Sequence, residues 1–251
     1  MARVLSANNV HTVISALRVF ESASSESEVN LVKASVLAGT PKRFVASVWG
    51  VQYAEGSMVG DARARTLTEL RTTNLEWTRF NNGYFLDCFG PSTLKSYMQP
   101  VVYAIDVAHK AAGIPGTGNE PMAFTYTFDV ARFLLAALDL PKWEEEMYCY
   151  GEKTTWNAFL KAAEDARGSK FNVSYDPLGK LQRGKVTELP AHQDMGYEVF
   201  SREALQQLMA IWGQFVLDGR YDLPLDKALN KTFAEVHPMT VKDVLAMWQG
   251  L

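Results

Sequence analysis

Four side chains in this sequence have the chemistry to act on a small molecule as acid, base or anion-stabilising group. Tyr53 and Tyr84 are phenols that can donate a proton as general acids. Arg79 can stabilise a developing enolate or phenolate, because a cationic donor in a dry pocket lowers the energy of the anion that it faces. His192, in the segment ELPAHQDMGYE, can reach over such a pocket as part of a lid, with a plain surface loop as the alternative. We predict that these four residues form the catalytic group.

A second set of side chains has the types that hold a flat ligand, namely hydroxyls, amides and aromatic rings. Most of them follow an apolar run typical of a strand, and in open α/β sheets the ligand crevice lies beyond the carboxyl ends of the strands. Stacking and a few hydrogen bonds suit a phenolic or polyketide-like molecule. The predicted substrate-binding residues are Ser15, Arg18, Ser47, Trp49, Asn81, Asn82, Tyr126, Met195 and Tyr197. For Trp49 core packing is the competing interpretation, and for Asn82 it is turn formation.

Motifs for other chemistries are missing from the sequence. It contains no HExxH, GxSxG or GxxxxGK[ST] pattern, which disfavours a zinc protease, an α/β-hydrolase and a P-loop enzyme. The two cysteines, Cys88 and Cys149, stand far apart and belong to no Cys/His cluster, so we predict neither a disulfide framework nor a metal site. This cysteine usage favours a cytosolic protein.

These residues are positioned by a pattern of strands that alternate with helices. Short β-branched runs at 10–17, 43–49 and 75–80 suit strands that are buried on both faces. Apolar residues at helical spacing follow the first two runs, at 29–37 and 61–70. This βαβαβ order predicts a parallel sheet with right-handed crossovers.

Beyond residue 120 the predicted elements are shorter and more often helical. A strand at 122–127 precedes a helix capped by Asp129, and further helices start near Thr154, Ser201 and Thr240. The sequence thus predicts an α/β fold, a truncated Rossmann-like parallel sheet flanked by helices, with a smaller and mostly helical C-terminal region. We assign 1–140 to the core and 141–251 to a substrate-covering region, within one compact domain.

Length and charge exclude several classes of partner. The 251 residues carry 25 basic and 28 acidic side chains, a net charge of −3, and the two signs are interspersed. A nucleic-acid-binding protein would show a basic footprint, so nucleic acid is not a predicted partner. The N-terminus lacks the pattern of a signal peptide and no run of about 18 apolar residues occurs, so we predict no membrane contact and a cytoplasmic location.

Several blocks of the chain resemble a known family. The segments VHTVIS at 10–15, AGTPKRFVASVW at 38–49 and FTYTFDVARFLLAALDLPKW at 124–143 resemble the fungal NmrA-like, isoflavone-reductase-like branch of the atypical short-chain dehydrogenases. The resemblance covers nearly the whole chain. It implies a Rossmann domain that binds NAD(P), with a C-terminal region closing over the substrate, and it places the start of this chain at the family's fourth strand.

Two departures from the family pattern bear on the activity. The glycine-rich turn that the resemblance places in the first βα unit is missing, a loss of about 60 residues at ~30 per βαβ unit. The only glycine cluster, GIPGTGNEP at 113–121, reads as a loop. The resemblance also implies a catalytic lysine in the helix at 61–70, where the sequence has Asp61, Ala62 and Arg63. We therefore predict that no cofactor is bound.

Three functions stay open on the sequence alone. The first is a cofactor-independent isomerase, cyclase or dehydratase that acts by acid-base catalysis on an aromatic, phenolic or polyketide-like small molecule of secondary metabolism. The second is an NAD(P)H-dependent NmrA-like reductase, and the third is a non-enzymatic regulator or scaffold. The strand at 10–17 should form a bare apolar sheet edge, which a second copy of the chain in a homodimer would cover.

Overall fold

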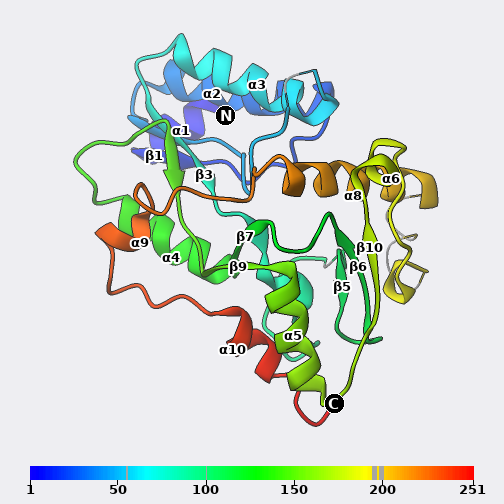
Figure 1. Ribbon diagram of the computed structural model, residues 1–251. Helices are drawn as coiled ribbons and strands as arrows, with labels where there is room; N and C mark the ends of the chain where they lie inside the picture. The colour runs from blue at the N-terminus through cyan, green and yellow to red at the C-terminus, as the bar shows by residue number, and fades with distance from the viewer. Residues whose placement is uncertain (55, 100, 194–196, 198–200) are drawn as a thin grey trace.

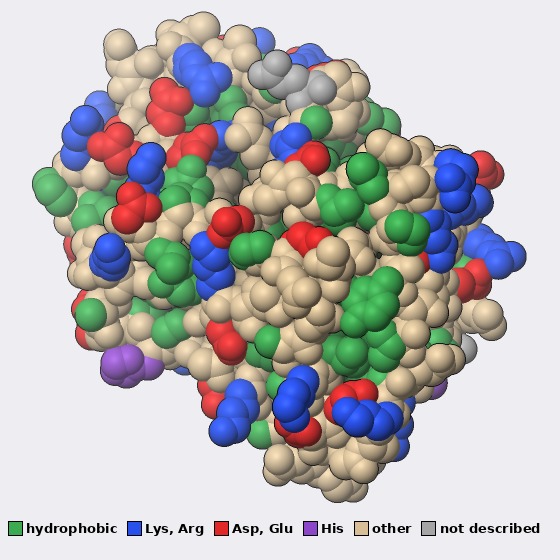
Figure 2. Space-filling view, viewed as in Figure 1, with side chains coloured by type: hydrophobic (Ala, Val, Ile, Leu, Met, Phe, Trp, Pro, Cys, Tyr) green, Lys and Arg blue, Asp and Glu red, His purple; other side chains and the backbone are tan. Residues whose placement is uncertain are grey.

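The computed structural model describes residues 1–54, 56–99, 101–193, 197 and 201–251. The N-terminal third, in blue and cyan in Figure 1, lies in the upper part of the molecule, and the C-terminus lies at the opposite end. Acidic and basic side chains are interspersed over the face shown in Figure 2. In the described part of the chain, no helix has the length and apolar character needed to cross a membrane.

The upper part is built on the predicted parallel sheet. Its strands, in spatial order, are β1 (Thr12–Ile14), β2 (Arg43–Val45), β3 (Glu76–Asn81) and β8 (Glu146–Tyr148). Each neighbouring pair runs parallel, with Phe44 opposite Val13 on one side and opposite Trp77 on the other. The structure confirms the α/β fold and the parallel sheet. Strand β2 is shorter than predicted, although the Ala46 N–H still donates to the Thr78 carbonyl at 2.9 Å.

Helices cover both faces of this sheet. They are α1 (Ala2–Ala7), α2 (Ser22–Ala38), α3 (Met58–Arg71) and α4 (Thr127–Ala137). Successive strand residues point to opposite faces, and both Phe44 and Val45 are fully buried. Phe44 packs with Leu70 in the layer of α2 and α3, whereas Val45 packs with Phe133 under α4. Burial on both faces explains why the strands are continuous apolar runs.

The lower part contains two small three-stranded sheets that the sequence predicted only in part. One has the order β4-β7-β9 and the other β10-β6-β5. Their strands are β4 (Tyr84–Phe85), β5 (Ile105–Asp106), β6 (Ala111–Pro115), β7 (Pro121–Thr125), β9 (Glu152–Thr155) and β10 (Asn172–Asp176). The glycine cluster is not wholly a loop, because Gly113 lies inside β6. Strand β6 was missed because its residues, AAGIP, are small or contain proline and lack the β-branched signal.

Of the remaining helices, those that begin near Thr154, Ser201 and Thr240 lie close to the predicted positions, and the other three were not predicted. These remaining helices are η1 (Leu86–Phe89), α5 (Trp156–Arg167), α6 (Leu178–Gln182), α8 (Arg202–Leu217), α9 (Leu229–Thr232) and α10 (Val241–Ala246). Ser201 caps α8, and Thr240 with Asp243 forms the predicted capping box of α10. The prediction for Asp129 was wrong: Tyr126 is the N-cap of α4, and the Asp129 carboxylate lies in the first turn, accepting from Met239 N at 2.8 Å and pairing with Arg132.

Strand β1 is the edge of the parallel sheet among the described residues. Ile14 and Leu17 at this edge are 45% and 40% exposed, which confirms the apolar edge but does not show what covers it. At the other edge β8, which follows residue 140, pairs with β3. The division of the chain at 140 stays a prediction.

A buried carboxylate ties α2 to the sheet and to α3. Glu28 is fully buried, and its Oε1 accepts from the Ser47 backbone N–H at 2.7 Å. Its Oε2 accepts from the Thr66 hydroxyl at 2.9 Å. One side chain thus fixes both helices and the segment that follows β2.

We expect Glu28→Ala to lower the free energy of unfolding by about 3 kcal/mol, because it leaves two buried donors without an acceptor. Glu26→Ala on the same helix removes only an exposed ion pair with Arg65, and it should change the free energy of unfolding by less than about 0.5 kcal/mol. Urea denaturation of the two variants measures both values. Equal losses would show that Glu28 does not hold the helices together.

Candidate functional site

A small cavity lies beside the carboxyl ends of β2 and β3, under helix α3. Its volume is about 130 Å³, and an engineered cavity of about 150 Å³ in another protein binds one benzene ring. We call it the arginine pocket. Its lining residues are Val48, Gln52, Tyr53, Gly60, Arg63, Ala64, Leu67, Arg71 and Arg79.

A wider hollow of about 400 Å³ lies on the outer surface between α2 and α3. Its wall is largely charged, and Arg65 pairs there with Glu26 at 2.7 Å, with both side chains about half exposed. Most of its charged side chains are exposed, and none of its lining residues has an enclosed polar atom without a partner, so we do not treat it as the ligand site.

The start of α3 places Arg63 in the wall of the arginine pocket. Ser57 caps the helix, its Oγ accepting from the Gly60 N–H at 3.1 Å. Glycine is required at position 60, because a Cβ there would lie 2.0 Å from the Ala54 carbonyl oxygen. Arg63 follows three residues later, on the same face of the helix as Gly60.

The Arg63 guanidinium is a cation whose inner nitrogens have no protein partner. The residue is half-buried, and its Nε and Nη1 are enclosed without a hydrogen-bond acceptor. The carbon of its guanidinium lies 4.9 Å from the centre of the Tyr53 ring. Desolvation lowers the pKa of Arg63, while Tyr53, Glu28 and Tyr221 act in the opposite direction. An arginine remains charged under these conditions, so the site presents a cation with free donors.

Tyr53 is held so that its hydroxyl proton is free. The Trp212 Nε1–H of α8 donates to the Tyr53 hydroxyl oxygen at 2.8 Å, and the Tyr53 ring meets Phe215 edge-on at 5.0 Å. Burial raises the pKa of Tyr53, partly offset by the bond from Trp212 and by Arg63. The phenol is therefore neutral near pH 7 and can donate its proton to a ligand.

Tyr84, the other predicted acid, lies in an aromatic cluster that adjoins Tyr53. Its ring lies 5.8 Å from Trp212, 5.7 Å from Tyr103 and 6.3 Å from Tyr221. Burial raises the pKa of Tyr84 well above the ordinary value, as it does for Tyr103 and Tyr221. The Tyr103 hydroxyl is enclosed and has no partner.

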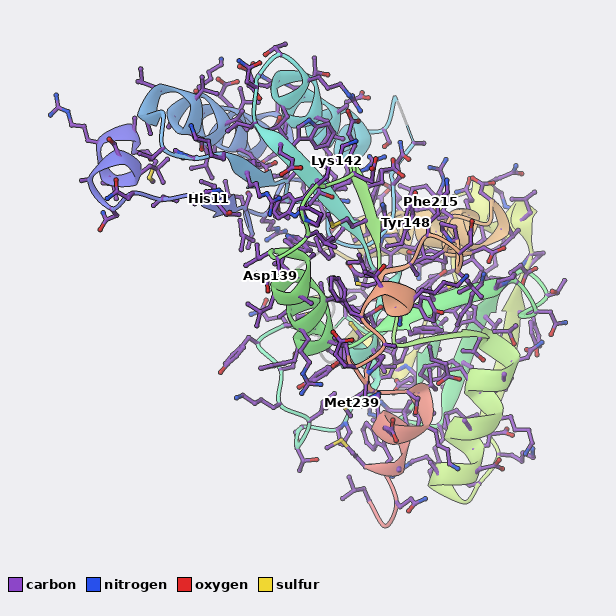
Figure 3. All side chains as sticks on the ribbon, turned by 90° about the vertical axis from the view of Figure 1, so that its left-hand side faces the viewer. His11, Asp139, Lys142, Tyr148, Phe215 and Met239 are labelled. Carbon is purple, nitrogen blue, oxygen red and sulfur yellow. The ribbon has the colours of Figure 1, made fainter. Side chains whose placement is uncertain are left out.

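Arg79 enters the arginine pocket from β3. Its Nη2 contacts Gln52 Oε1 at 3.3 Å and forms an ion pair with Glu146, and its Nε has no partner. Desolvation lowers the pKa of Arg79, whereas Tyr148 raises it. Figure 3 shows Tyr148 at the end of β8 and Phe215 on α8 near the middle of the molecule, whereas His11 lies by α1, away from both.

Three predicted binding residues gather at the ends of β1 and β2. The Trp49 indole donates to the Ser15 carbonyl at 3.1 Å, and its ring lies 5.7 Å from Phe80. The Ser47 hydroxyl donates to the Leu17 carbonyl at 2.6 Å, and the Ser15 hydroxyl is buried without a partner. Packing and backbone contacts account for Trp49 and Ser47.

Two asparagines at the end of β3, Asn81 and Asn82, join this sheet to the small sheets. Asn82 Oδ1 accepts from the Gly50 N–H at 2.8 Å, and its carbonyl accepts from the Thr125 hydroxyl at 2.6 Å. The side-chain nitrogens of Asn81 and Asn82 are enclosed and have no partner. Both residues support the turn and also leave donors at the carboxyl edge.

Of the five other predicted residues, four make contacts elsewhere and one lies outside the described residues. Arg18 is exposed, with its guanidinium 5.2 Å from the Phe20 ring centre. Tyr126 donates to the Lys95 carbonyl, and Tyr197 donates to Glu188 at 2.5 Å. Met195 lies outside the described residues.

The fourth, His192, has both ring nitrogens engaged by the backbone. It is 2% exposed, with Nδ1 accepting from the Leu189 N–H at 3.2 Å and Nε2 donating to the Val102 carbonyl at 3.0 Å. Desolvation lowers its pKa. These contacts give His192 the role of fixing its own segment in place.

Curated relatives of the chain include fungal proteins named oxidoreductases. The chain is 29% identical to oxidoreductase BOA1 of Botryotinia fuckeliana, over 95% of this chain and 77% of that protein. It is 26% identical to oxidoreductase swnN of Metarhizium robertsii, over 97% of this chain and 79% of that protein. No family model matches the chain.

Solved structures with the same fold include several reductases. Leucoanthocyanidin reductase from Vitis vinifera, in its binary complex with NADPH, superposes with a TM-score of 0.74 at 15% identity, covering 98% of this chain and 80% of that one. Isoflavone reductase superposes with a TM-score of 0.72 at 18% identity, covering 97% and 77%. The chain is thus similar in sequence to fungal oxidoreductases and similar in fold to these reductases.

Because leucoanthocyanidin reductase, which has the same fold, is described in a complex with NADPH, a dinucleotide is the cofactor to test against the residues present. A pyrophosphate binds at a helix N-terminus, where free N–H groups face the anion. The described residues place two helix starts at the carboxyl edge of the parallel sheet. Glu21 closes α2 in a capping box with Ser24, and α3 is capped by Ser57 with Asp61 in its first turn. A phosphate would meet a carboxylate at both, so these described residues do not fit a pyrophosphate.

No group of His, Cys, Asp and Glu side chains among the described residues has the arrangement of a metal site. Cys88 and Cys149 are both buried, and burial raises the pKa of Cys88 to about 12, so its thiol is inert near pH 7.

Sequence reasoning missed the most informative residue of the site. Arg63 was noted only as one of the residues where the family resemblance implies a lysine. The available signal was the position of Arg63, because this arginine is a cation in the helix where the resemblance implies a lysine. Trp212 follows the apolar periodicity of α8, and Tyr103 and Tyr221 lie outside helices and strands. Nothing in the sequence distinguishes these three residues from core packing.

We expect the free energy of unfolding to fall as the pH rises above about 10. Burial raises the pKa of Tyr53, Tyr84, Tyr103 and Tyr221, so the unfolded chain releases these protons at lower pH than the folded one. Their contribution is complete below the ordinary tyrosine pKa and is lost as the pH passes through the raised values. Tyrosinate absorbance and far-UV circular dichroism, followed together, should change in step. Ionisation of all ten tyrosines with the dichroism unchanged would contradict this.

Proposed function

We propose that the protein is a non-redox isomerase or cyclase that acts on a phenolic or enolisable carbonyl compound in the arginine pocket. The observation that carries this proposal is Arg63, whose enclosed Nε and Nη1 face no acceptor beside the Tyr53 phenol. Unpaired charge inside a protein is destabilising, and a scaffold would be more stable with an apolar side chain there. The arrangement suits an oxyanion that forms during a reaction.

The chemistry needs one cation and one proton donor. In a hydroxyaryl enone, the phenol loses its proton to water and Arg63 stabilises the phenolate. The phenolate oxygen bonds to the β-carbon of the enone, and the π electron pair moves onto the carbonyl oxygen as an enolate. Tyr53 donates its proton to that enolate and is reprotonated from water, and the enol then becomes the ketone. The product is an isomer of the substrate, so no oxidant or reductant is consumed.

Trp212 has a positioning role in this scheme. Its indole N–H donates to the Tyr53 oxygen at 2.8 Å, which directs the phenol proton away from Trp212. The same bond favours the tyrosinate that exists after proton transfer, because a hydrogen bond to the charged form stabilises it.

A second candidate function is an NAD(P)H-dependent reductase. The names of the fungal relatives favour it, since both are called oxidoreductases. The two functions differ in their need for a hydride donor, so the dependence of turnover on NADPH separates them.

We expect the purified protein to cyclise 2′-hydroxycrotonophenone, a hydroxyaryl enone with a single ring, without added cofactor, at a rate that NADPH does not change. Arg63→Met and Tyr53→Phe should each lower kcat by about 10²–10³, the usual effect of removing an oxyanion donor or a general acid. Arg65→Gln, an exposed arginine on the same helix, is the matched control and should keep full activity. The loss of enone absorbance gives the rate for the wild-type protein and the three variants.

Turnover that requires NADPH would instead support the reductase. Loss of activity in Arg65→Gln equal to that in Arg63→Met would show that the effect is not local to the pocket.

We also propose that the protein acts on its small aromatic substrate as a homodimer, in which a second copy of the chain covers the β1 edge. The exposure of Ile14 and Leu17 supports this. Sedimentation at micromolar concentration should show a dimer that Ile14→Lys converts to a monomer. Leu178→Lys, at an exposed apolar residue of α6, should leave the dimer intact. A monomeric wild-type protein would overturn the proposal.

A further inference from the structure

The arginine pocket contains more positive charge than the proposed acid-base step uses. Arg63 and Arg71 from α3 and Arg79 from β3 all line one cavity of about 130 Å³. Like charges at such short range repel, and the repulsion grows where water is excluded. The lining residues that the structure describes include no carboxylate.

Carboxylates outside the lining satisfy this charge only in part. Arg71 pairs with Glu145 at 3.1 Å, with both side chains about half exposed. Arg79 is only 6% exposed, and its ion pair with Glu146 and its contact with Gln52 both involve Nη2. The enclosed Nε of Arg79 is left without a partner. A donor this deeply buried normally has an acceptor.

We propose that the substrate carries a carboxylate, which binds to Arg79 at the β3 wall of the arginine pocket while Arg63 faces the reacting oxygen. This inference rests on the proposed function and names its substrate class, a small aromatic or enolisable acid. A guanidinium is the side chain best suited to a carboxylate, because its planar donors match the two oxygens. Arg71, at the more exposed side, adds attraction for the entering anion.

The surroundings favour a carboxylate over a phosphate. Phosphates bind at open helix N-termini, but the start of α3 beside the pocket is capped by Ser57 and has Asp61 in its first turn. Asp61 Oδ1 also accepts from the Gly56 N–H at 2.8 Å, so that backbone donor is already used. Val48 and Leu67 give the wall an apolar part that suits a ring. A singly charged group on a ring therefore fits better than a dianion.

The test is calorimetric binding of three probes: 4-hydroxybenzoate, its methyl ester and inorganic phosphate. The acid and the ester share the ring and the phenol and differ only in the charge that Arg79 would recognise. We expect the wild-type protein to bind the acid at least tenfold more tightly than the ester, and phosphate more weakly than the acid.

Variants of Arg79 test whether this residue causes the preference for the acid over the ester. Arg79→Lys keeps a cation for Glu146, which maintains the fold, and should reduce the ratio of acid to ester affinity several-fold; Arg79→Gln should abolish it. Arg65→Gln, on the outer face of α3, should keep the full ratio. Thermal unfolding of each variant verifies that it is folded.

Three results would overturn the inference: equal binding of acid and ester, no binding of either at millimolar concentration, or an unchanged ratio in folded Arg79→Gln. Failure of the proposed function would give a different result, because the calorimetric experiment measures binding and not turnover. An acid preference that depends on Arg79, in a protein that cyclises nothing, would retain the carboxylate site and reject the reaction.

Discussion

The rest of the structure depends on one constraint. The Arg63 guanidinium lies inside the protein and has no ion-pair partner among the described residues. Arg63 leaves two enclosed nitrogens without acceptors, and the Tyr53 ring covers it at 4.9 Å. Such a group lowers stability unless a ligand or a reaction uses it. The start of α3 that carries Arg63 lies close to the preceding segment, because a Cβ on Gly60 would come within 2.0 Å of the Ala54 carbonyl oxygen.

The rest of the fold keeps this group in position. Glu28 joins α2 to α3 and to the segment after β2, which leads to Gln52 and Tyr53. From the other side, Trp212 of α8 fixes the Tyr53 hydroxyl, and Arg220 donates to the Gln52 carbonyl at 2.9 Å. The lining of the pocket thus comes from β3, α3 and the segment between β2 and α3, and the C-terminal region holds Tyr53 and Gln52 in place.

The sequence predicted the parts of the fold that carry a strong periodic signal. The β-branched runs around Val13, Phe44 and Thr78 gave the parallel sheet, and the caps at Ser201 and Thr240 gave two helix starts. The strand at 111–115 has no such signal, and its pairing with β10 depends on contacts far along the chain. Tyr53 was predicted, but its neighbours Arg63 and Trp212 were not, because long-range packing brings them together from three separate elements.

The measurement that tests the central claim most directly is the pKa of a chromophoric phenol bound in the arginine pocket, read from its phenolate absorbance. If Arg63 stabilises an oxyanion, the bound phenol should ionise at lower pH than in water, and the Arg63→Met protein should lose that shift. A bound phenol whose pKa is unchanged or raised in the wild-type protein would contradict the account, because the pocket would then stabilise no anion.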